Sequence, residues 1–283
     1  MSLTLPVAHN DVAATRPATH APHRRRPTPE PAETGGHLAS VSKALMLLDI
    51  MRSAPGPVGV SMLARDAGMP KSTTFRLLAY LEQSGFVERA GKAYQLGWRL
   101  FELGNHVEHC RPSGLREIAL PYLADLHART GMNVHLAVLS GTDVVYLEKI
   151  HGLRSIPIGT SVGTRMPATI SALGKAMLAY ADRATLREVV ESGLEGRTPY
   201  SLRQPGQLIA QLRETRETGV AYDREESQLG INCVAAPIHA DGEVIAALSV
   251  CGPTRPVSAE AHADLVRVAA RDISRQLTLA RAC

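Results

Sequence analysis

The chain has 283 residues, 45% of them hydrophobic, which is enough for two domains that each bury a core. Its net charge is +4, and its apolar runs fall short of the roughly 18 residues that a membrane span requires. The N-terminus lacks the apolar segment of a secretory leader, so we expect neither membrane insertion nor export and predict a cytoplasmic protein.

The four cysteines are predicted to be reduced thiols. They show no CxxC spacing, and a cytoplasmic setting keeps thiols reduced. They are Cys110, Cys233, Cys251 and Cys283.

Residues 1–38 are rich in Ala, Pro, His and Thr and contain few large apolar groups. Their only charge cluster is the arginine run at 24–26. Such a segment cannot bury enough apolar surface to offset the entropy of ordering, so we predict a disordered tail.

A first helix is predicted from about Val41 to Arg52, where apolar residues recur at helical spacing. Ser40 or Ser42 is the expected N-cap, and the Pro-Gly-Pro run at 55–57 ends the helix. The apolar residues expected to face the core are Val41, Ala44, Leu45, Leu48 and Met51.

Residues 61–85 predict a helix-turn-helix. Gly68 stops a short helix, Pro70 suits a first helical turn, and a longer helix runs on toward Gly85. One stripe of this second helix is apolar and should be buried, with Phe75 at its edge. The opposite side carries hydroxyl, guanidinium and amide groups, which is typical of a recognition helix in a DNA major groove. The buried stripe comprises Thr74, Leu77, Leu78 and Leu81.

Two short strands, at 86–87 and 93–96, are predicted to follow as a wing with Arg89 and Lys92 facing phosphates. A helical hairpin alone also occurs in ordinary enzymes, but the basic hairpin after it favours DNA binding. Residues 40–97 carry seven basic and four acidic side chains, so most of the net charge lies here. The residues expected to contact DNA are Ser42, Lys43, Lys71, Ser72, Thr73, Arg76, Tyr80, Arg89 and Lys92.

A connecting helix is predicted within residues 98–112. Trp98, Leu100, Phe101 and Leu103 make it too apolar for a lone linker, and a second copy of the chain is the expected partner. The nearby H-x-x-H-C cluster at 106–110 lacks further ligands, so we predict no metal site and no cofactor.

Residues 113–283 predict an antiparallel α+β domain. A helix over 115–130 ends at Gly131 and precedes a hairpin at 133–147. A second hairpin at 233–250 turns at Asp241-Gly242. Helices are expected at about 171–181, 183–193, 205–218 and 259–281, the last capped by Ser258.

The chain resembles the IclR-type bacterial transcriptional regulators over about residues 40–279. The winged-helix part matches at 70–78 and 81–87. The C-terminal part matches three family signatures in order, at 163–179, 222–238 and 247–253. The domain order that this implies is a tail (1–38), a winged helix-turn-helix (39–97), a linker helix (98–112) and a GAF-like effector domain (113–283).

The resemblance implies a ligand-responsive regulator, a repressor rather than an activator, that forms a homodimer or a dimer of dimers on a pseudo-palindromic double-stranded operator. Its effector would be a small organic or aromatic acid. Cys251 stands where relatives often carry Ser, and residues 166–169 depart from the usual Pro-Leu-His, so the ligand stays open. The residues matching family ligand contacts are Ala172, Leu173, Asp223, Ile231, Cys233, Ser249 and Cys251.

The chemistry of these residues is compatible with that reading, because a helix starting near Ser171 offers N–H groups to a carboxylate and Asp223 suits a ligand hydroxyl. Equally, residues 171–174 could simply pack a helix closely on the sheet, with Cys233 as a core thiol. Two alternatives are a DNA-binding regulator without a ligand and an enzyme using Asp223, Glu225, Glu226 or Cys233. No catalytic motif organises these four residues.

Overall fold

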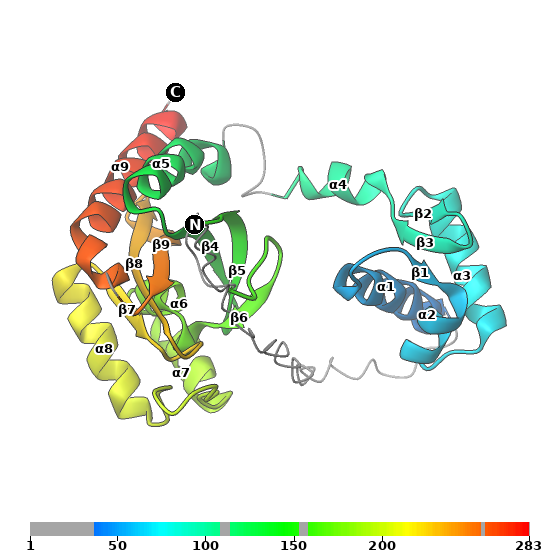
Figure 1. Cartoon of the computed structure of the whole chain (residues 1–283), viewed down its shortest axis with the longest axis horizontal. Coiled ribbons are helices and arrows are strands. Elements are labelled where there is room, and N and C mark those ends of the chain that lie inside the picture. Colours follow the sequence, from blue (N-terminus) through cyan, green and yellow to red (C-terminus); the bar gives the residue numbers. More distant parts are fainter. Residues whose placement is uncertain (1–36, 108–113, 153–157, 256–257, 283) are drawn as a thin grey trace, which may run out of the picture. The chain divides into compact units, whose positions relative to one another are not determined.

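The computed structural model describes residues 37–107, 114–152, 158–255 and 258–282 (Figure 1). The chain divides into two compact units, one ending at Leu96 and the other starting at Gly97. Almost all of the tail predicted to be disordered lies outside the described residues. Residues 37 and 38 of that tail belong to the first helix instead.

The first unit is a winged helix. Its three strands form an antiparallel sheet in the order β1-β3-β2, and β2 and β3 pair in register from Val87↔Leu96 to Ala90↔Ala93. The elements are α1 (His37–Ser53), β1 (Val58–Gly59), α2 (Val60–Asp66), α3 (Lys71–Gln83), β2 (Val87–Ala90) and β3 (Ala93–Leu96). Buried side chains from all three helices and from the strands form one small core.

Helix α1 differs from its prediction. It begins at His37, so Ser40 and Ser42 lie inside the helix and neither is the N-cap. Val41 and Leu45 are exposed, whereas Leu47 and Met51 are buried. The predicted stripe was therefore wrong on one side, because α1 is apolar nearly all round and its spacing alone does not select the buried face.

The second unit contains a six-stranded antiparallel sheet in the order β6-β5-β4-β9-β8-β7. Its strands are β4 (Asn133–Ser140), β5 (Asp143–Ile150), β6 (Arg165–Pro167), β7 (Ala221–Arg224), β8 (Ile231–Ala240) and β9 (Glu243–Pro253). Its helices are α4 (Trp98–Gly104), α5 (Leu115–Thr130), η2 (Ala168–Ile170), α6 (Ala172–Leu178), α7 (Arg183–Glu191), α8 (Pro205–Thr218), η3 (Ala259–His262) and α9 (Ala263–Ala282). This confirms the predicted α+β class.

Helices cover both faces of this sheet (Figure 1). On one face, α5 and α9 pack on Val134, Leu136 and other large apolar side chains. On the other face, α6, α7 and α8 pack on smaller residues such as Ala137 and Ala235. Because both faces are covered, Asn133 and His135 are buried as well, although the alternating sequence of β4 is also compatible with a solvent-facing side.

The turns of the two hairpins lie at the residues that the sequence predicts. Gly141 takes a positive φ of 63° between β4 and β5, and Asp241 and Gly242 take positive φ values of 52° and 84° between β8 and β9. Two successive positive φ values are the signature of the twisted two-residue hairpin turn. Strands β6 and β7 have only three and four residues and were not predicted.

The prediction of reduced thiols is wrong for one pair of cysteines. Cys233 on β8 lies directly opposite Cys251 on β9, with their Cα atoms 4.2 Å apart, and the two form a disulfide. The register of the hairpin brings them together, and neither sequence spacing nor an expected compartment could reveal that. The other two cysteines lie outside the described residues.

Candidate functional site

Helix α3 is presented by a short, well-defined turn. Gly68 takes a φ of 63°, Pro70 is the N-cap, and the hydroxyl of Thr74 donates to the Pro70 carbonyl. Thr74, Leu77 and Leu78 are buried as predicted. Phe75, which the sequence placed at the edge of this stripe, is instead 51% exposed.

The exposed side of α3 carries most of the residues expected to contact DNA. Lys71, Ser72, Arg76 and Tyr80 are exposed, and Thr73 is half-buried. Among the described residues, neither Lys71 nor Arg76 has an ion-pair partner. On α1, Ser42 and Lys43 are exposed too. These side chains are available for phosphates and base edges.

The two basic residues of the wing differ. The guanidinium of Arg89 donates to both carboxylate oxygens of Glu82, at 3.0 and 3.2 Å, and stacks over the Tyr94 ring. A phosphate contact by Arg89 would compete with these interactions. Lys92 lies in the exposed turn between β2 and β3 and has no ion pair within the described part of the chain. Lys92 is therefore more available than Arg89 for a phosphate contact.

A small cavity of about 20 Å³ lies within the second unit, on the face of the sheet that α6 covers. Residues from β4, β5, β7, β8, β9 and α6 line it, so segments more than a hundred residues apart meet there. All seven residues that match family ligand contacts are in its lining. A space of this size holds about one water molecule.

Several polar lining residues were not identified from the sequence. His135, Tyr146, Thr160 and Ser227 line the cavity but belong to none of the three signatures as ligand contacts. Nε2 of His135 lies 3.1 Å from the Thr160 hydroxyl, while its Nδ1 has no partner among the described residues. The alternating pattern of β4 put His135 on one face together with Asn133, which was the only available signal.

Burial sets the charge state of His135. Loss of solvent, with Lys149 and His151 adding to it, lowers the pKa of His135 to about 3. The imidazole is therefore neutral at physiological pH. The cavity lining contains no Lys or Arg side chain. Hydrogen-bonding groups, rather than a cation, would have to recognise any anion bound there.

Asp223 is buried, and its carboxylate accepts hydrogen bonds from the loop that follows it. One carboxylate oxygen accepts from the backbone N–H of Glu226 at 2.7 Å, and the other accepts from the Ser227 hydroxyl at 2.5 Å. Burial raises the pKa of Asp223 to about 6, while the Ser227 hydrogen bond and the charge of Lys175 oppose that rise. This carboxyl is thus already engaged in shaping the loop that follows β7.

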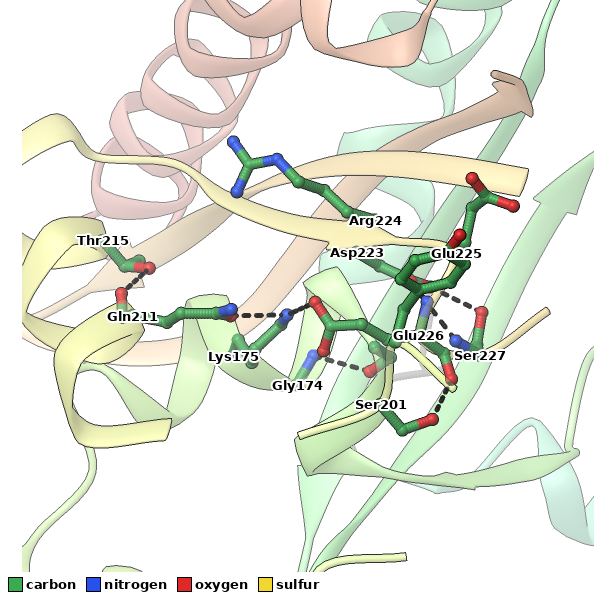
Figure 2. A network of polar contacts seen from close by, with 12 residues as sticks. Gly174, Lys175, Ser201, Gln211, Thr215, Asp223, Arg224, Glu225, Glu226 and Ser227 are labelled. Carbon is green, nitrogen blue, oxygen red and sulfur yellow. Dashed lines mark hydrogen bonds and ion pairs between the residues drawn. The ribbon is translucent and has the colours of Figure 1, made fainter. Parts of the chain in front are cut away.

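A buried ion pair anchors the same loop (Figure 2). The ammonium of Lys175 on α6 donates to Glu226 at 2.5 Å and to Gln211 on α8 at 2.8 Å. The Ser201 hydroxyl donates to the Glu226 carbonyl. From the sequence, residues 223–226 are more simply a solvated loop than a set of catalytic groups. That interpretation is wrong for Glu226, because its side chain is only 3% exposed.

The start of α6 combines capping with close packing. The Ser171 hydroxyl accepts from the backbone N–H of Gly174, and a Cβ at Gly174 would collide with the backbone of Ala168. Both features agree with the packing role that the sequence left open. The remaining residues of the first turn, Ala172 and Leu173, line the cavity.

Comparison with known families settles the class of protein. Residues 40–91 match the IclR helix-turn-helix domain, and residues 109–275 match the C-terminal domain of the bacterial transcriptional regulator IclR. The second match alone spans more than half of the chain. The chain belongs to the IclR family of bacterial transcriptional regulators. Members of this family are DNA-binding regulators, so the enzyme alternative falls.

Two curated IclR-family relatives come from Escherichia coli strain K12. The transcriptional regulator XynR is 34% identical over 218 residues, covering 75% of this chain and 85% of XynR. The transcriptional repressor AllR is 31% identical over 269 residues, covering 90% of this chain and 97% of AllR. The similarity to AllR thus runs through both units.

Two solved IclR-family structures resemble the chain along their whole length. IclR of Thermotoga maritima is 33% identical with a TM-score of 0.72, covering 86% of this chain and all of that one. An IclR homologue from Microbacterium hydrocarbonoxydans, complexed with 4-hydroxybenzoate, is 27% identical with a TM-score of 0.79 at the same coverage. The fold is therefore that of experimentally known family members.

The described residues include neither a membrane-spanning helix nor a metal-binding cluster. No helix there combines the length and apolar character of a membrane span. No cluster of three or more His, Cys, Asp and Glu side chains there could hold a metal ion. Most of the H-x-x-H-C segment lies outside the described residues.

Proposed function

We propose that this IclR-family regulator is a repressor that binds a pseudo-palindromic operator as a homodimer and responds to a small organic or aromatic acid in the cavity beside α6. The effector domain's seven family-matched residues carry the proposal, because they come from four separate elements and converge on one cavity. The Microbacterium homologue, which was crystallised with 4-hydroxybenzoate, supports an acid of this class.

The DNA-binding part of the proposal rests on the exposed side of α3. Arg76, Ser72 and Thr73 would enter the major groove, with Lys71 and Tyr80 beside them. Lys43 and Lys92 would meet phosphates from outside the groove, and Ser42 and Arg89 would add to these contacts. Two such units related by a two-fold axis would read two half-sites about one helical turn apart.

The loop from Asp223 to Gly230 would act as the lid of the effector cavity. A cavity of about 20 Å³ is too small for an aromatic acid, so binding requires this loop or its neighbours to move outward. The ligand alters operator affinity only as far as it prefers one arrangement of the protein over another. Typical couplings of this kind are about 1–3 kcal/mol, or roughly 5- to 150-fold in affinity.

The test uses the full-length chain and an operator selected from random-sequence duplexes. Wild type and Ser249→Leu are titrated with 4-hydroxybenzoate and other small acids while operator release is followed. Ser249 is buried within the cavity wall, so a leucine there should fill the space and abolish the response. Operator binding without ligand should stay near the wild-type level, since Ser249 is far in sequence from the winged helix and belongs to the other unit.

A matched control is Ser274→Ala on α9, where the hydroxyl is outside the cavity lining. This variant should respond like wild type. If Ser249→Leu responds with the same half-saturation as wild type, the cavity is not the effector site. If wild type ignores every acid tested, the proposal reverts to a regulator that binds DNA without a small ligand.

A further inference from the structure

Phe75 is half exposed to solvent on α3, a helix whose leucines are buried or half-buried. It is 51% exposed, whereas Leu77 and Leu78, the next apolar residues of α3, belong to the buried core. Phe75 is not among the residues that pack against that core. An exposed aromatic ring of this kind gains free energy when a partner covers it, so its surroundings indicate which partner it suits.

The neighbours of Phe75 on the surface are set by the helical repeat. Ser72, Phe75 and Ala79 lie within about 60° of one another around the axis, and all three are exposed. Arg76 lies on the same side. Phe75 and Ala79 therefore form a small apolar surface with the Ser72 hydroxyl and the Arg76 guanidinium along one edge.

The charge of α3 selects DNA over another protein surface. Lys71 and Arg76 are exposed and have no ion-pair partner among the described residues. Glu82 is the only acid in α3, and Arg89 pairs with it. The apolar surface thus lies within a positive one, which matches a polyanion with an apolar group in its groove.

The major groove of DNA offers one such group, the 5-methyl of thymine, and phenylalanine and alanine side chains both contact it. We propose that Phe75, with Ala79 beside it, is a specificity-determining residue that recognises a thymine methyl in each operator half-site. The inference rests on the proposed function, since it requires α3 to lie in the major groove. It assigns a role to a residue that the donor-based prediction of DNA contacts omitted.

The experiment removes the methyl group and nothing else. An operator is first selected from random-sequence duplexes with the full-length wild-type protein. Each thymine is then replaced in turn by deoxyuridine, which pairs in the same way but lacks the 5-methyl. At one thymine of each half-site, wild type should lose about 3- to 10-fold in affinity, as expected for one buried methyl group.

Variants at Phe75 identify the residue responsible. Phe75→Ala should bind the thymine operator and the deoxyuridine operator equally and about as weakly as wild type binds the latter. Phe75→Leu, the matched control, keeps an apolar side chain and should keep part of the preference for thymine. Because Phe75 is exposed and outside the core, unchanged thermal unfolding of both variants should accompany these results.

The outcomes separate the inference from the function on which it rests. Failure to select any operator would remove the proposed function, and the inference with it. An operator at which deoxyuridine has no effect, or the same effect in wild type and Phe75→Ala, overturns the inference alone. A Phe75→Ala variant that changes subunit assembly and leaves thymine discrimination intact would make Phe75 a protein contact instead, which also overturns it.

Discussion

The ammonium group of Lys175 lies 2.5 Å from a carboxylate oxygen of Glu226, and neither side chain is more than 3% exposed. Burial lowers the pKa of Lys175, and the nearby Glu226 carboxylate opposes that effect. The two residues are 51 positions apart and connect α6 to the loop that follows β7. This ion pair therefore ties the cavity's helix to the segment that we propose as its lid.

Removing one member of this ion pair should lower the free energy of unfolding more than removing both members. Lys175→Met leaves the Glu226 carboxylate buried without its cation, which should lower the free energy of unfolding by about 3–5 kcal/mol. The double variant Lys175→Met with Glu226→Met removes both charges and should recover most of that loss. Urea unfolding of wild type, both single variants and the double variant gives the coupling directly. If the loss of unfolding free energy in the double variant equals the sum of the two single losses, the two charges are not coupled.

The two cations on the DNA-binding side should act differently on operator affinity. If Arg76 reads a guanine, Arg76→Ala should cost about 1–3 kcal/mol on the selected operator and little on unrelated DNA. Lys92→Ala should weaken binding to all sequences alike and reduce the slope of affinity against salt. Binding titrations at several salt concentrations separate the two effects. A folded Arg76→Ala protein with full operator affinity would remove its assigned role.

Helix α4 carries the prediction of a dimer. Trp98 is 71% exposed and Phe101 62%, and their rings meet edge to face at 6.1 Å, while no residue of α4 is buried. We expect a second copy to cover this surface, so Trp98→Asp should shift the protein toward monomers and weaken operator binding. Sedimentation at micromolar concentration measures the first effect.

The matched control for that variant is Tyr200→Asp, which adds the same charge at another exposed aromatic side chain of the second unit. It should leave assembly and DNA affinity unchanged. A wild-type protein that sediments as a monomer, with DNA affinity unaffected by Trp98→Asp, would contradict the dimer.

Sequence patterns predicted the helices and turns whose conformation depends on neighbouring residues in the chain. Helix α5 spans the predicted residues because Gly131 accepts the left-handed conformation that ends it, and Asp241-Gly242 sets the turn of the second hairpin. The fold class followed from such elements. By contrast, the effector residues were predicted from the resemblance to IclR-type regulators, because their spacing in the sequence does not show that they meet in the fold.

Features that depend on tertiary contacts were missed. The Cys233–Cys251 disulfide requires the register of β8 on β9, and the Lys175–Glu226 pair requires α6 to pack beside β7. Phe75 was placed at the buried edge because helical angles give a direction but not the extent of the core beneath. His135 was missed because an alternating strand looks the same whether one or both of its faces are covered.

The burial of His135 makes a last prediction about pH. In the unfolded chain a histidine has a pKa of about 6.5, whereas burial lowers the pKa of His135 to about 3 in the folded protein. The unfolded state therefore binds the proton first as the pH falls. Above pH 6.5, His135 is neutral in both states and its burial does not lower the free energy of unfolding through protonation. Below pH 6.5, the free energy of unfolding falls by about 1.4 kcal/mol per pH unit, until the pH reaches the pKa of the folded state. Between pH 7 and pH 5 the loss is about 2 kcal/mol.

Asp223 acts in the opposite direction, because a folded pKa raised to about 6 makes its contribution more favourable as the pH falls from 6 toward 4. Comparing wild type with His135→Gln cancels that term, since both proteins contain Asp223. The difference in free energy of unfolding between them, measured with urea, should shift by about 2 kcal/mol against wild type from pH 7 to pH 5. If His135→Gln follows the wild-type curve, protonation of His135 does not oppose folding.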